Sequence, residues 1–239
     1  MKLFIIRYLK IGFVYLRLHV LFDLFSSLYA NLYYLSKFSK WRATHKKVKY
    51  NDFPSAWKYE KRYPLYTTIF EMEGLQQEAI DYFEFGVAAG QSFKWFLHQN
   101  KNPESRFVGF DTFTGLPEDF GVYKKGSFNT NHQTPVINDE RGSFQQGLFQ
   151  QTLPAFLKDF QHHKRKVVMM DADLYSATLF VLAALGPHFK KDDIIIFDQF
   201  SVPTHEFKAW YEFARLYPTV QMELIAAGNN YYFSVFKIL

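Results

Sequence analysis

From about residue 67 onward, short apolar runs alternate with stretches of helical periodicity. The apolar runs have the length of buried strands and lie at 80–87, 106–111, 166–173 and 193–200. Helical periodicity is found between them, at 67–79, 92–100 and 174–186. Strands that alternate with helices predict a mostly parallel sheet with helices on both faces. The last two apolar runs, 220–227 and 230–239, are separated by Gly228 and Asn229 and predict an antiparallel hairpin.

The first 66 residues follow a different pattern. Residues 3–29 are strongly apolar, but Arg7, Lys10 and Arg17 interrupt the run. On a helical wheel these three side chains gather on one side, which is typical of an amphipathic helix at a membrane surface and not of a membrane span. The alternative is a helix that docks on the rest of the protein or on a second copy in a homo-oligomer.

Charge divides the chain at the same place. Residues 1–66 hold 13 Lys and Arg against 3 acids, a net charge of +10, whereas the remainder holds 15 against 20, a net charge of −5. We therefore expect two parts: a basic amphipathic helical extension and linker over 1–66, and one α/β domain over 67–239. A basic arm on an acidic body predicts contact with an anionic surface, here a membrane touched by residues 1–35.

The chain contains no cysteine. This excludes disulfides, thiolate metal sites and cysteine nucleophiles, so any metal must be bound by oxygen or imidazole. No small-residue cleavage signature follows the apolar N-terminal run, so we expect no export. The expected location is the cytoplasm, peripheral on the inner face of the membrane if the arm binds lipid.

A glycine-bearing turn follows the first strand of the domain. Its sequence, EFGVAAGQS at 84–92, lacks the G-x-G-x-x-G spacing of dinucleotide sites, because Ala88 and Gln91 stand at the second and third glycine places. Small residues let a ligand approach the backbone, and the acid Glu84 suits a ligand that carries an ammonium group. The turn therefore favours a ligand with an ammonium and a carboxylate over one with a pyrophosphate.

Three predicted strands end in an acid: Asp111, Asp171 and Asp198. The carboxyl ends of parallel strands share one edge of the sheet, where ligands bind. Asp171 and Asp198, with the amide oxygen of Gln199, would make an all-oxygen site for a hard divalent cation such as Mg²⁺. Without a metal, the two acids would share a proton or bind a substrate hydroxyl directly. We interpret Asp173 as a helix N-cap and not as a ligand.

Five motifs, in this order, resemble the class I S-adenosylmethionine-dependent methyltransferases of the macrocin O-methyltransferase (TylF/MycF-like) family: EFGVAAGQS, GFDTFTGLPE, GLFQQTLP, DADLYSAT and IIIFDQF. The resemblance covers about residues 67–239. It implies a Rossmann-like fold, S-adenosylmethionine as cofactor, and a hydroxyl of a sugar or glycosylated metabolite as the methyl acceptor.

The resemblance also implies roles for individual residues. The methionine part of the cofactor would lie along the turn, at Glu84, Gly86, Ala88, Gly90 and Ser92. Asp111 would accept hydrogen bonds from the ribose hydroxyls, with Thr112 beside it, and residues 147–149 would lie near the adenine. Asp171 is the first candidate for the base that removes the acceptor proton. The family commonly has a second acid where this chain has Gln199, which lowers the charge of the metal site by one.

Residues 117–143 are polar and contain glycine, and they predict a lid, a binding loop or a disordered piece. As a lid, the segment would close over cofactor and acceptor, and its aromatic side chains would stack on a sugar ring. The alternative function is a non-catalytic membrane- or glycan-associated module with a methyltransferase fold. Nucleic acid is not an expected partner, because the domain is acidic and lacks the N-P-P-Y type of segment that holds a flipped base. His132 and His205 lie in predicted loops and are interpreted as solvated.

Overall fold

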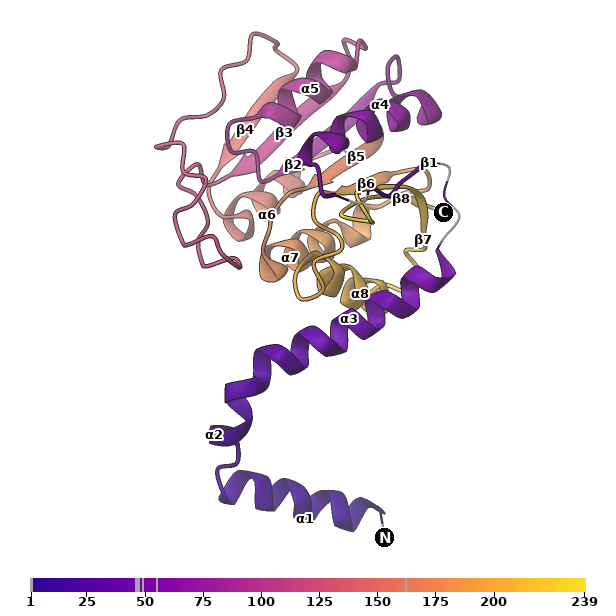
Figure 1. The fold of residues 1–239 in the computed structure, drawn as a ribbon. Helices are drawn as coiled ribbons and strands as arrows, with labels where there is room; N and C mark the ends of the chain where they lie inside the picture. The colour runs from indigo at the N-terminus through magenta and orange to yellow at the C-terminus, as the bar shows by residue number, and fades with distance from the viewer. Residues whose placement is uncertain (1, 46–47, 49, 55, 162) are drawn as a thin grey trace. The chain divides into compact units, whose positions relative to one another are not determined.

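The computed structural model describes residues 2–45, 48, 50–54, 56–161 and 163–239. Residues 1, 46, 47, 49 and 55 of the predicted arm and linker lie outside the described residues. The chain divides into two compact units, Met1–Thr44 and His45–Leu239 (Figure 1).

The larger unit is built on an eight-stranded sheet. In chain order the strands are β1 (Tyr50–Asp52), β2 (Ile80–Phe85), β3 (Arg106–Asp111), β4 (Gly142–Gln146), β5 (Arg165–Met170), β6 (Ile194–Phe197), β7 (Met222–Gly228) and β8 (Phe233–Ile238). Across the sheet they follow the order β1-β7-β8-β6-β5-β2-β3-β4, and every pair is parallel except the two that involve β8. The predicted parallel sheet with a C-terminal antiparallel hairpin is therefore confirmed.

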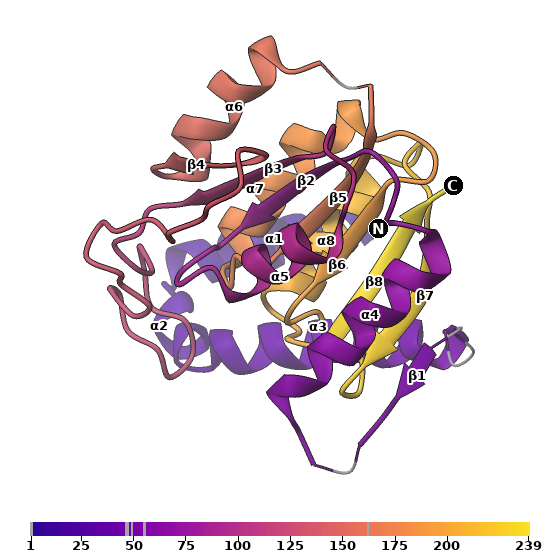
Figure 2. The ribbon, with the colours of Figure 1, turned by 90° about the horizontal axis from the view of Figure 1, so that it is seen from above.

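Helices cover both faces of this sheet (Figures 1 and 2). They are α4 (Arg62–Glu73), α5 (Gln91–Gln99), α6 (Phe149–Asp159), α7 (Tyr175–Leu185) and α8 (Glu206–Leu216), with short 3-10 helices η2 (Tyr59–Lys61) and η3 (Gly186–His188). Helices α4 and α5 lie on one face and α6, α7 and α8 on the other. The core between the sheet and the first pair of helices is rich in rings, among them Tyr66, Tyr82 and Phe96.

The domain begins earlier than its charge pattern predicts. The sequence placed the boundary after residue 66, whereas β1 pairs with β7 and α4 starts at Arg62. Leu65 and Ile69 of α4 are fully buried against the sheet, and this burial makes the helix part of the core despite its basic surroundings. The helix predicted at 67–79 ends at Gly74, whose left-handed φ of 68° caps it.

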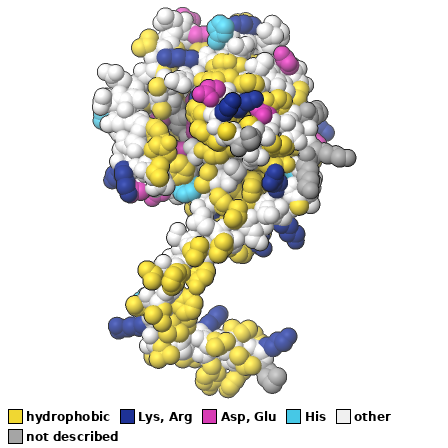
Figure 3. All heavy atoms as spheres, viewed as in Figure 1, with side chains coloured by type: hydrophobic (Ala, Val, Ile, Leu, Met, Phe, Trp, Pro, Cys, Tyr) yellow, Lys and Arg dark blue, Asp and Glu magenta, His cyan; other side chains and the backbone are white. Residues whose placement is uncertain are grey.

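The smaller unit is a helical arm. It contains α1 (Lys2–Tyr15), α2 (His19–Phe22), the 3-10 helix η1 (Asp23–Phe25) and α3 (Ser26–Thr44). The chain bends by 81° between α1 and the helices that follow, next to Arg17, whose φ is 50°. Apolar side chains cover most of the arm surface seen in Figure 3. Among the described residues no single helix is long and apolar enough to cross a membrane, although this bent pair meets the requirement by length and composition when taken together.

Candidate active site

The order in which the chain adds strands to the sheet reverses between β2 and β5. After β2 the chain builds β3 and β4 on one side, and it returns to place β5 and β6 on the other. In open α/β sheets a crevice forms at the carboxyl ends of the strands where this reversal occurs. The turn that begins with Gly86 and the acid Asp171 follow β2 and β5, so both lie at that crevice. Asp171 N–H donates to Phe85 O at 2.9 Å and fixes the two ends together.

Two glycines of the turn are required by close approaches. A Cβ on Gly86, which has φ 94°, would lie 1.8 Å from the carbonyl oxygen of Asp171. A Cβ on Gly90, with φ 73°, would lie 2.6 Å from the side chain of Pro135. Ala88 also adopts a left-handed conformation, at φ 46°. The turn is thus pressed between the end of β5 and the long segment that joins β3 to β4.

Asp111 holds this turn through its carboxylate. Oδ2 accepts the backbone N–H groups of Val87 at 2.7 Å and Ala88 at 2.8 Å, and Oδ1 accepts that of Phe113 at 2.7 Å. The bond to Phe113 is the side-chain contact of a turn, so Asp111 also shapes the start of the segment after β3. Because each carboxylate oxygen has two lone pairs, Oδ1 keeps acceptor capacity for a ligand.

Most of the predicted site residues line one cavity of about 900 Å³. They are Gly86, Ala88, Gly90, Ser92, Asp111, Thr112, Asp171 and Gln199. A volume of this size lies within the range of about 300–1,000 Å³ that is usual for small-molecule sites. Two predicted residues, Glu84 and Asp198, are outside the lining.

Glu84 lies behind the turn and not beside a ligand. It is completely buried, and its carboxylate accepts hydrogen bonds from Ser92 Oγ at 2.7 Å and from the Tyr82 hydroxyl. Burial raises the pKa of Glu84 to about 7, against the opposing effect of these two hydrogen bonds. The side chain therefore supports the turn from within the core, and it lies outside the cavity lining in which it was expected.

Arg62 brings a positive charge to the acids that follow β5 and β6. Its Nη1 lies 3.6 Å from Asp198 Oδ1 and 3.9 Å from Asp171 Oδ2. Arg62 is 3% exposed and Asp198 1%, whereas the side chain of Asp171 keeps 20% of its surface exposed at the cavity. Tyr59 and Tyr63 accept hydrogen bonds from the guanidinium, and their ring centroids lie 4.1 and 5.2 Å from its carbon.

Burial and the contacts among Arg62, Asp171 and Asp198 shift the pKa values of all three side chains. Burial, followed by the carboxylates of Asp198 and Asp173, raises the pKa of Asp171 well above its usual value. Burial also raises the pKa of Asp198, although Arg62 and Tyr66 oppose that change. For Arg62, burial disfavours the charged form, but Tyr66, Asp198 and Tyr59 outweigh this cost and raise the pKa. The two acids thus titrate as a pair beside a permanently charged guanidinium.

Asp173 is part of the site, contrary to its interpretation as an N-cap. Its φ of 59° is not the extended conformation of a capping residue, and Leu174 stands at the N-cap of α7. Gln199 donates a hydrogen bond from Nε2 to Asp173 Oδ1. Burial, then Asp198, raises the pKa of Asp173 to about 7. Asp173 therefore adds a third carboxylate at the cavity wall.

The residues predicted to bind a metal do not fit that role well. The guanidinium of Arg62 already stands beside both Asp171 and Asp198. Asp198 Oδ2 and Gln199 Oε1 have no hydrogen-bond partner, but both atoms are buried away from solvent. Within the described residues there is no group of three His, Asp or Glu side chains arranged to hold a metal ion. Mg²⁺ normally keeps several waters around it, and a guanidinium between its two carboxylate ligands would repel it.

Aromatic side chains form part of the cavity wall. They make two clusters, one of Trp57, Tyr59 and Tyr232 and one of Tyr123 and Phe128. Trp57 lies 5.7 Å from Tyr59 and 5.6 Å from Tyr232 between ring centroids, and Tyr123 lies 4.9 Å from Phe128. These rings offer flat apolar faces next to a cluster of charged groups.

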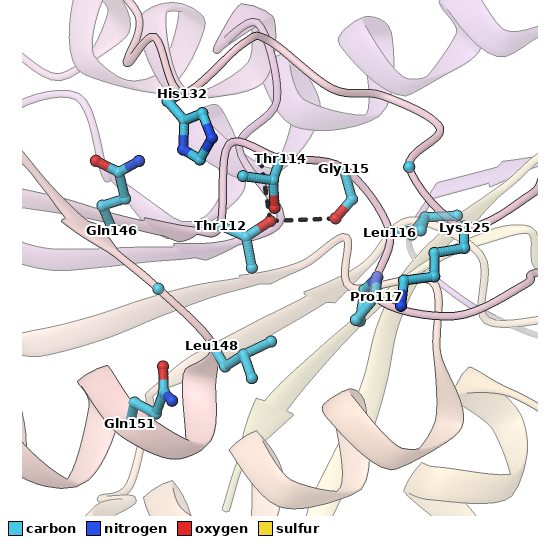
Figure 4. A pocket seen from close by; sticks show the side chains of 12 residues that line it. Thr112, Thr114, Gly115, Leu116, Pro117, Lys125, His132, Gln146, Leu148 and Gln151 are labelled. Carbon is cyan, nitrogen blue, oxygen red and sulfur yellow. Dashed lines mark hydrogen bonds between the residues drawn. The ribbon is translucent and has the colours of Figure 1, made fainter.

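A smaller cavity of about 590 Å³ adjoins the first one (Figure 4). Thr112, Leu116 and Leu148 line both cavities. His132 points into the smaller one from the long segment, and Gln146 and Gln151 also line it. The 147–149 stretch, expected near an adenine, therefore lies at the junction of the two cavities.

Several of these residues had no signal in the sequence. Arg62, Trp57 and Tyr59 fall in the basic stretch that predicted a linker. Glu206, which is fully buried and accepts the backbone N–H of Gln199 at 2.9 Å, lies at the start of α8 without a recognisable motif. His205 is half-buried against Phe120, with ring centroids 4.8 Å apart, so it is less solvated than expected.

Comparison with known proteins gives an independent view of the chain. Residues 83–200 match a family described as a methyltransferase domain. No curated protein sequence matches.

Solved structures share the fold. The calicheamicin methyltransferase CalS11 superposes with a TM-score of 0.56 and 22% identity over 72% of this chain and 77% of that one. An O-methyltransferase from Bacillus cereus, solved in complex with SAH, superposes with a TM-score of 0.52 and 12% identity over 86% of this chain and 90% of that one. A cmcI structure with Mg and SAM superposes with a TM-score of 0.50 and 15% identity over 74% of this chain and 70% of that one. The chain therefore has the Rossmann-like class I fold of S-adenosylmethionine-dependent methyltransferases, and the family match over residues 83–200 supports a methyltransferase.

Proposed function

We propose that the protein transfers the methyl group of S-adenosylmethionine to a hydroxyl oxygen of a sugar or glycosylated metabolite. One observation carries the proposal: the glycine turn after β2 and the carboxylate of Asp171 line the same cavity. A donor on the turn and an acceptor at Asp171 would therefore lie side by side. The five motifs that resemble the macrocin O-methyltransferase family lie around this cavity and support the assignment.

The residues present suit the cofactor. The turn packs closely on Asp171 at Gly86 and on Pro135 at Gly90, and its residues 86–92 line the cavity, where a ligand can reach them. The N-terminus of α5 begins at Gln91 and would favour a carboxylate. Asp111 and Thr112 would face the ribose, and the smaller cavity between Gln146 and Gln151 would take the adenine.

The aromatic wall supports a sugar acceptor. The C–H faces of sugar rings pack well on flat apolar surfaces, and Trp57, Tyr232 and Tyr123 provide such surfaces in the cavity lining. One of the fold neighbours, CalS11, is described as a TDP-rhamnose 3'-O-methyltransferase. We infer that this chain also acts on a hydroxylated sugar.

The chemistry follows from the position of Asp171. S-adenosylmethionine supplies a methyl group on a positively charged sulfur when it is bound. Asp171 is placed to accept the proton of an acceptor hydroxyl, because of the two paired acids it is the one that lines the cavity. The hydroxyl oxygen then forms its bond to the methyl carbon while the carbon–sulfur bond breaks and the electron pair stays on sulfur.

The proposal is tested by binding and turnover together. S-adenosylmethionine and S-adenosylhomocysteine are titrated calorimetrically, and release of S-adenosylhomocysteine is measured with TDP-rhamnose and other nucleotide sugars. We expect both ligands to bind, and Asp171→Asn to keep binding while turnover falls by roughly 100-fold or more. Asp192→Asn, an acid at the opposite edge of the sheet that pairs with Lys237, is the matched control.

The alternative, a non-catalytic module, makes the opposite prediction. Such a protein would release no S-adenosylhomocysteine with any acceptor, and Asp171→Asn would change nothing. If neither cofactor form gives heat with the wild-type protein, the donor assignment is wrong.

A further inference from the structure

Arg62 lies where a catalytic cation would act. The guanidinium is within 4 Å of both Asp171 and Asp198, and it lines the cavity beside the acid assigned to the acceptor proton. Tyr59 and Tyr63 also hold it, through hydrogen bonds and ring contacts. A side chain that is 3% exposed and held in this way cannot withdraw to make room for a hydrated metal ion.

Gln199, the third residue predicted to bind the metal, also argues against a metal site. Gln199 is neutral and its amide nitrogen faces Asp173, so the side chain is oriented by a hydrogen bond within the protein. Even with both acids ionised, one fixed guanidinium leaves these three side chains a net charge of only −1, which is less attractive to a divalent cation than an acid set with no cation of its own.

We propose that Arg62 takes the place of a divalent cation, supplying the fixed positive charge that orients the Asp171 carboxylate and balances the Asp171–Asp198 pair, so that methyl transfer needs no metal. This inference rests on the proposed function. Arg62 is a positioning residue: it holds Asp171 while that carboxylate accepts the hydroxyl proton, and it takes no part in the bonds that form and break.

The first test needs no acceptor. Mn²⁺, which is visible by electron paramagnetic resonance and can replace Mg²⁺ at oxygen sites, is titrated into the wild-type protein saturated with S-adenosylhomocysteine. We expect the spectrum of free Mn²⁺ throughout. Stoichiometric bound Mn²⁺ that Asp171→Asn abolishes would overturn the inference, whether or not an acceptor has been found.

The second test uses turnover. Wild-type activity should be unchanged by EDTA and by added Mg²⁺, whereas loss with EDTA and recovery with Mg²⁺ would reject the role of Arg62 and leave the proposed function intact. Arg62→Met should lower kcat by roughly 100-fold with cofactor affinity unchanged, and Arg62→Lys should restore part of it. Lys61→Met, a neighbouring cation that pairs with Asp52 on the surface, is the control.

Partial recovery of Arg62→Ala by millimolar guanidinium chloride would show that the missing charge, and not a folding defect, limits turnover. Equal kcat for wild type and Arg62→Met would overturn the inference. If the Arg62 variants do not fold, the Mn²⁺ and EDTA measurements on the wild type still decide it.

The arm carries a second, independent inference. No residue of α1 is buried, and large apolar side chains on all sides of the arm are exposed, among them Leu3, Leu9, Val14 and Leu24. A helix that is apolar all round suits surroundings that are apolar on every side, and one protein surface covers only one stripe of it. Four cations, Lys2, Arg7, Lys10 and Arg17, accompany this surface, against the single acid Asp23 up to residue 36.

We propose that residues 2–36 embed in one leaflet of an anionic membrane. Acyl chains would cover the arm on all sides, and the Lys and Arg side chains would reach anionic headgroups. The 81° bend favours a segment that enters and stays in one leaflet over a straight span.

Vesicle sedimentation tests the arm in the full-length protein. Wild type should pellet with phosphatidylcholine–phosphatidylglycerol vesicles, and Leu9→Asp combined with Phe13→Asp should leave most of it in the supernatant. Arg7→Glu with Lys10→Glu should reduce pelleting with anionic vesicles and have little effect on neutral ones. Equal pelleting of wild type and the double Asp variant would overturn the proposal, as would a solution dimer that the same two substitutions dissociate and that ignores vesicles.

Discussion

Gly86 packs so closely on Asp171 that a Cβ at residue 86 would lie 1.8 Å from the Asp171 carbonyl oxygen. This contact joins the turn after β2 to the acid after β5 and fixes the distance between the two halves of the site. Gly86 also has a φ of 94°, a backbone conformation that residues with a side chain rarely adopt. Any larger residue at 86 must therefore displace the end of β5.

Gly86→Ala should lower the free energy of unfolding by about 3 kcal/mol or more and abolish methyl transfer, because strain and steric overlap add. Urea denaturation and S-adenosylhomocysteine release measure the two effects. Gly121→Ala is the control: its φ of 54° is strained as well, but nothing lies within 4 Å of the new Cβ. We expect it to cost about 1 kcal/mol and to leave turnover intact. Normal activity of Gly86→Ala would disprove the dependence on this contact.

Asp111→Ala should weaken cofactor binding by roughly 10- to 100-fold. The substitution leaves the N–H groups of Val87 and Ala88 without their acceptor, so the turn loses contacts that fix its conformation, and the proposed ribose contact is lost as well. Calorimetric titration with S-adenosylhomocysteine measures the change. Asp119→Ala removes an exposed acid that pairs with Lys124 in the long segment, and its affinity should match wild type. An Asp111 variant that binds as tightly as wild type would contradict this role.

The strands and their terminal acids were predictable from the sequence because local pattern determines them. Each buried parallel strand is a continuous apolar run, and Asp171 and Asp198 mark where two of those runs stop. The orientation of Glu84 was not predictable in the same way. Both faces of the sheet are covered, so no polar face shows which way alternate side chains of β2 point.

Arg62 and Trp57 were missed for another reason. They reach the site through α4 and the segment before it, and those segments come to the sheet by tertiary packing of Leu65 and Ile69, not by a motif. The residues around Arg62 and Trp57 are basic, like those of the arm. The charge pattern therefore assigned both residues to the N-terminal extension. Function at these positions depends on contacts between residues more than 100 positions apart in the chain, such as Arg62 with Asp198.

Tyr123 and Phe128 should contribute to acceptor binding and not to cofactor binding. Both lie in the segment between β3 and β4, and their rings line the cavity 4.9 Å apart. Tyr123→Ala and Phe128→Ala should each raise the KM for the acceptor by roughly 2- to 12-fold, the equivalent of about 0.5–1.5 kcal/mol for one aromatic contact. Val122→Ala changes a highly exposed neighbour and should leave KM unchanged. A rise in the Kd for the cofactor instead would show that these rings bind the cofactor and not the acceptor.

Glu84→Gln should change how stability depends on pH. The pKa of Glu84 is about 7 in the folded protein, raised by burial from an ordinary value of 4.5. The folded state therefore binds this proton more tightly than the unfolded state, and the stability it contributes is fully present below pH 4.5 and is lost as pH rises through 7. The difference corresponds to at most roughly 3 kcal/mol.

The amide introduced by Glu84→Gln would mimic the protonated acid at every pH. Relative to wild type, this variant should gain free energy of unfolding between pH 5 and pH 8, and the difference between the two proteins isolates Glu84 from the other buried acids. Urea denaturation at both pH values measures it. Ser92→Ala, which removes a hydrogen bond that favours the charged form, should shift stability the other way at pH 8. Identical pH profiles for wild type and Glu84→Gln would mean that Glu84 does not change its protonation on folding.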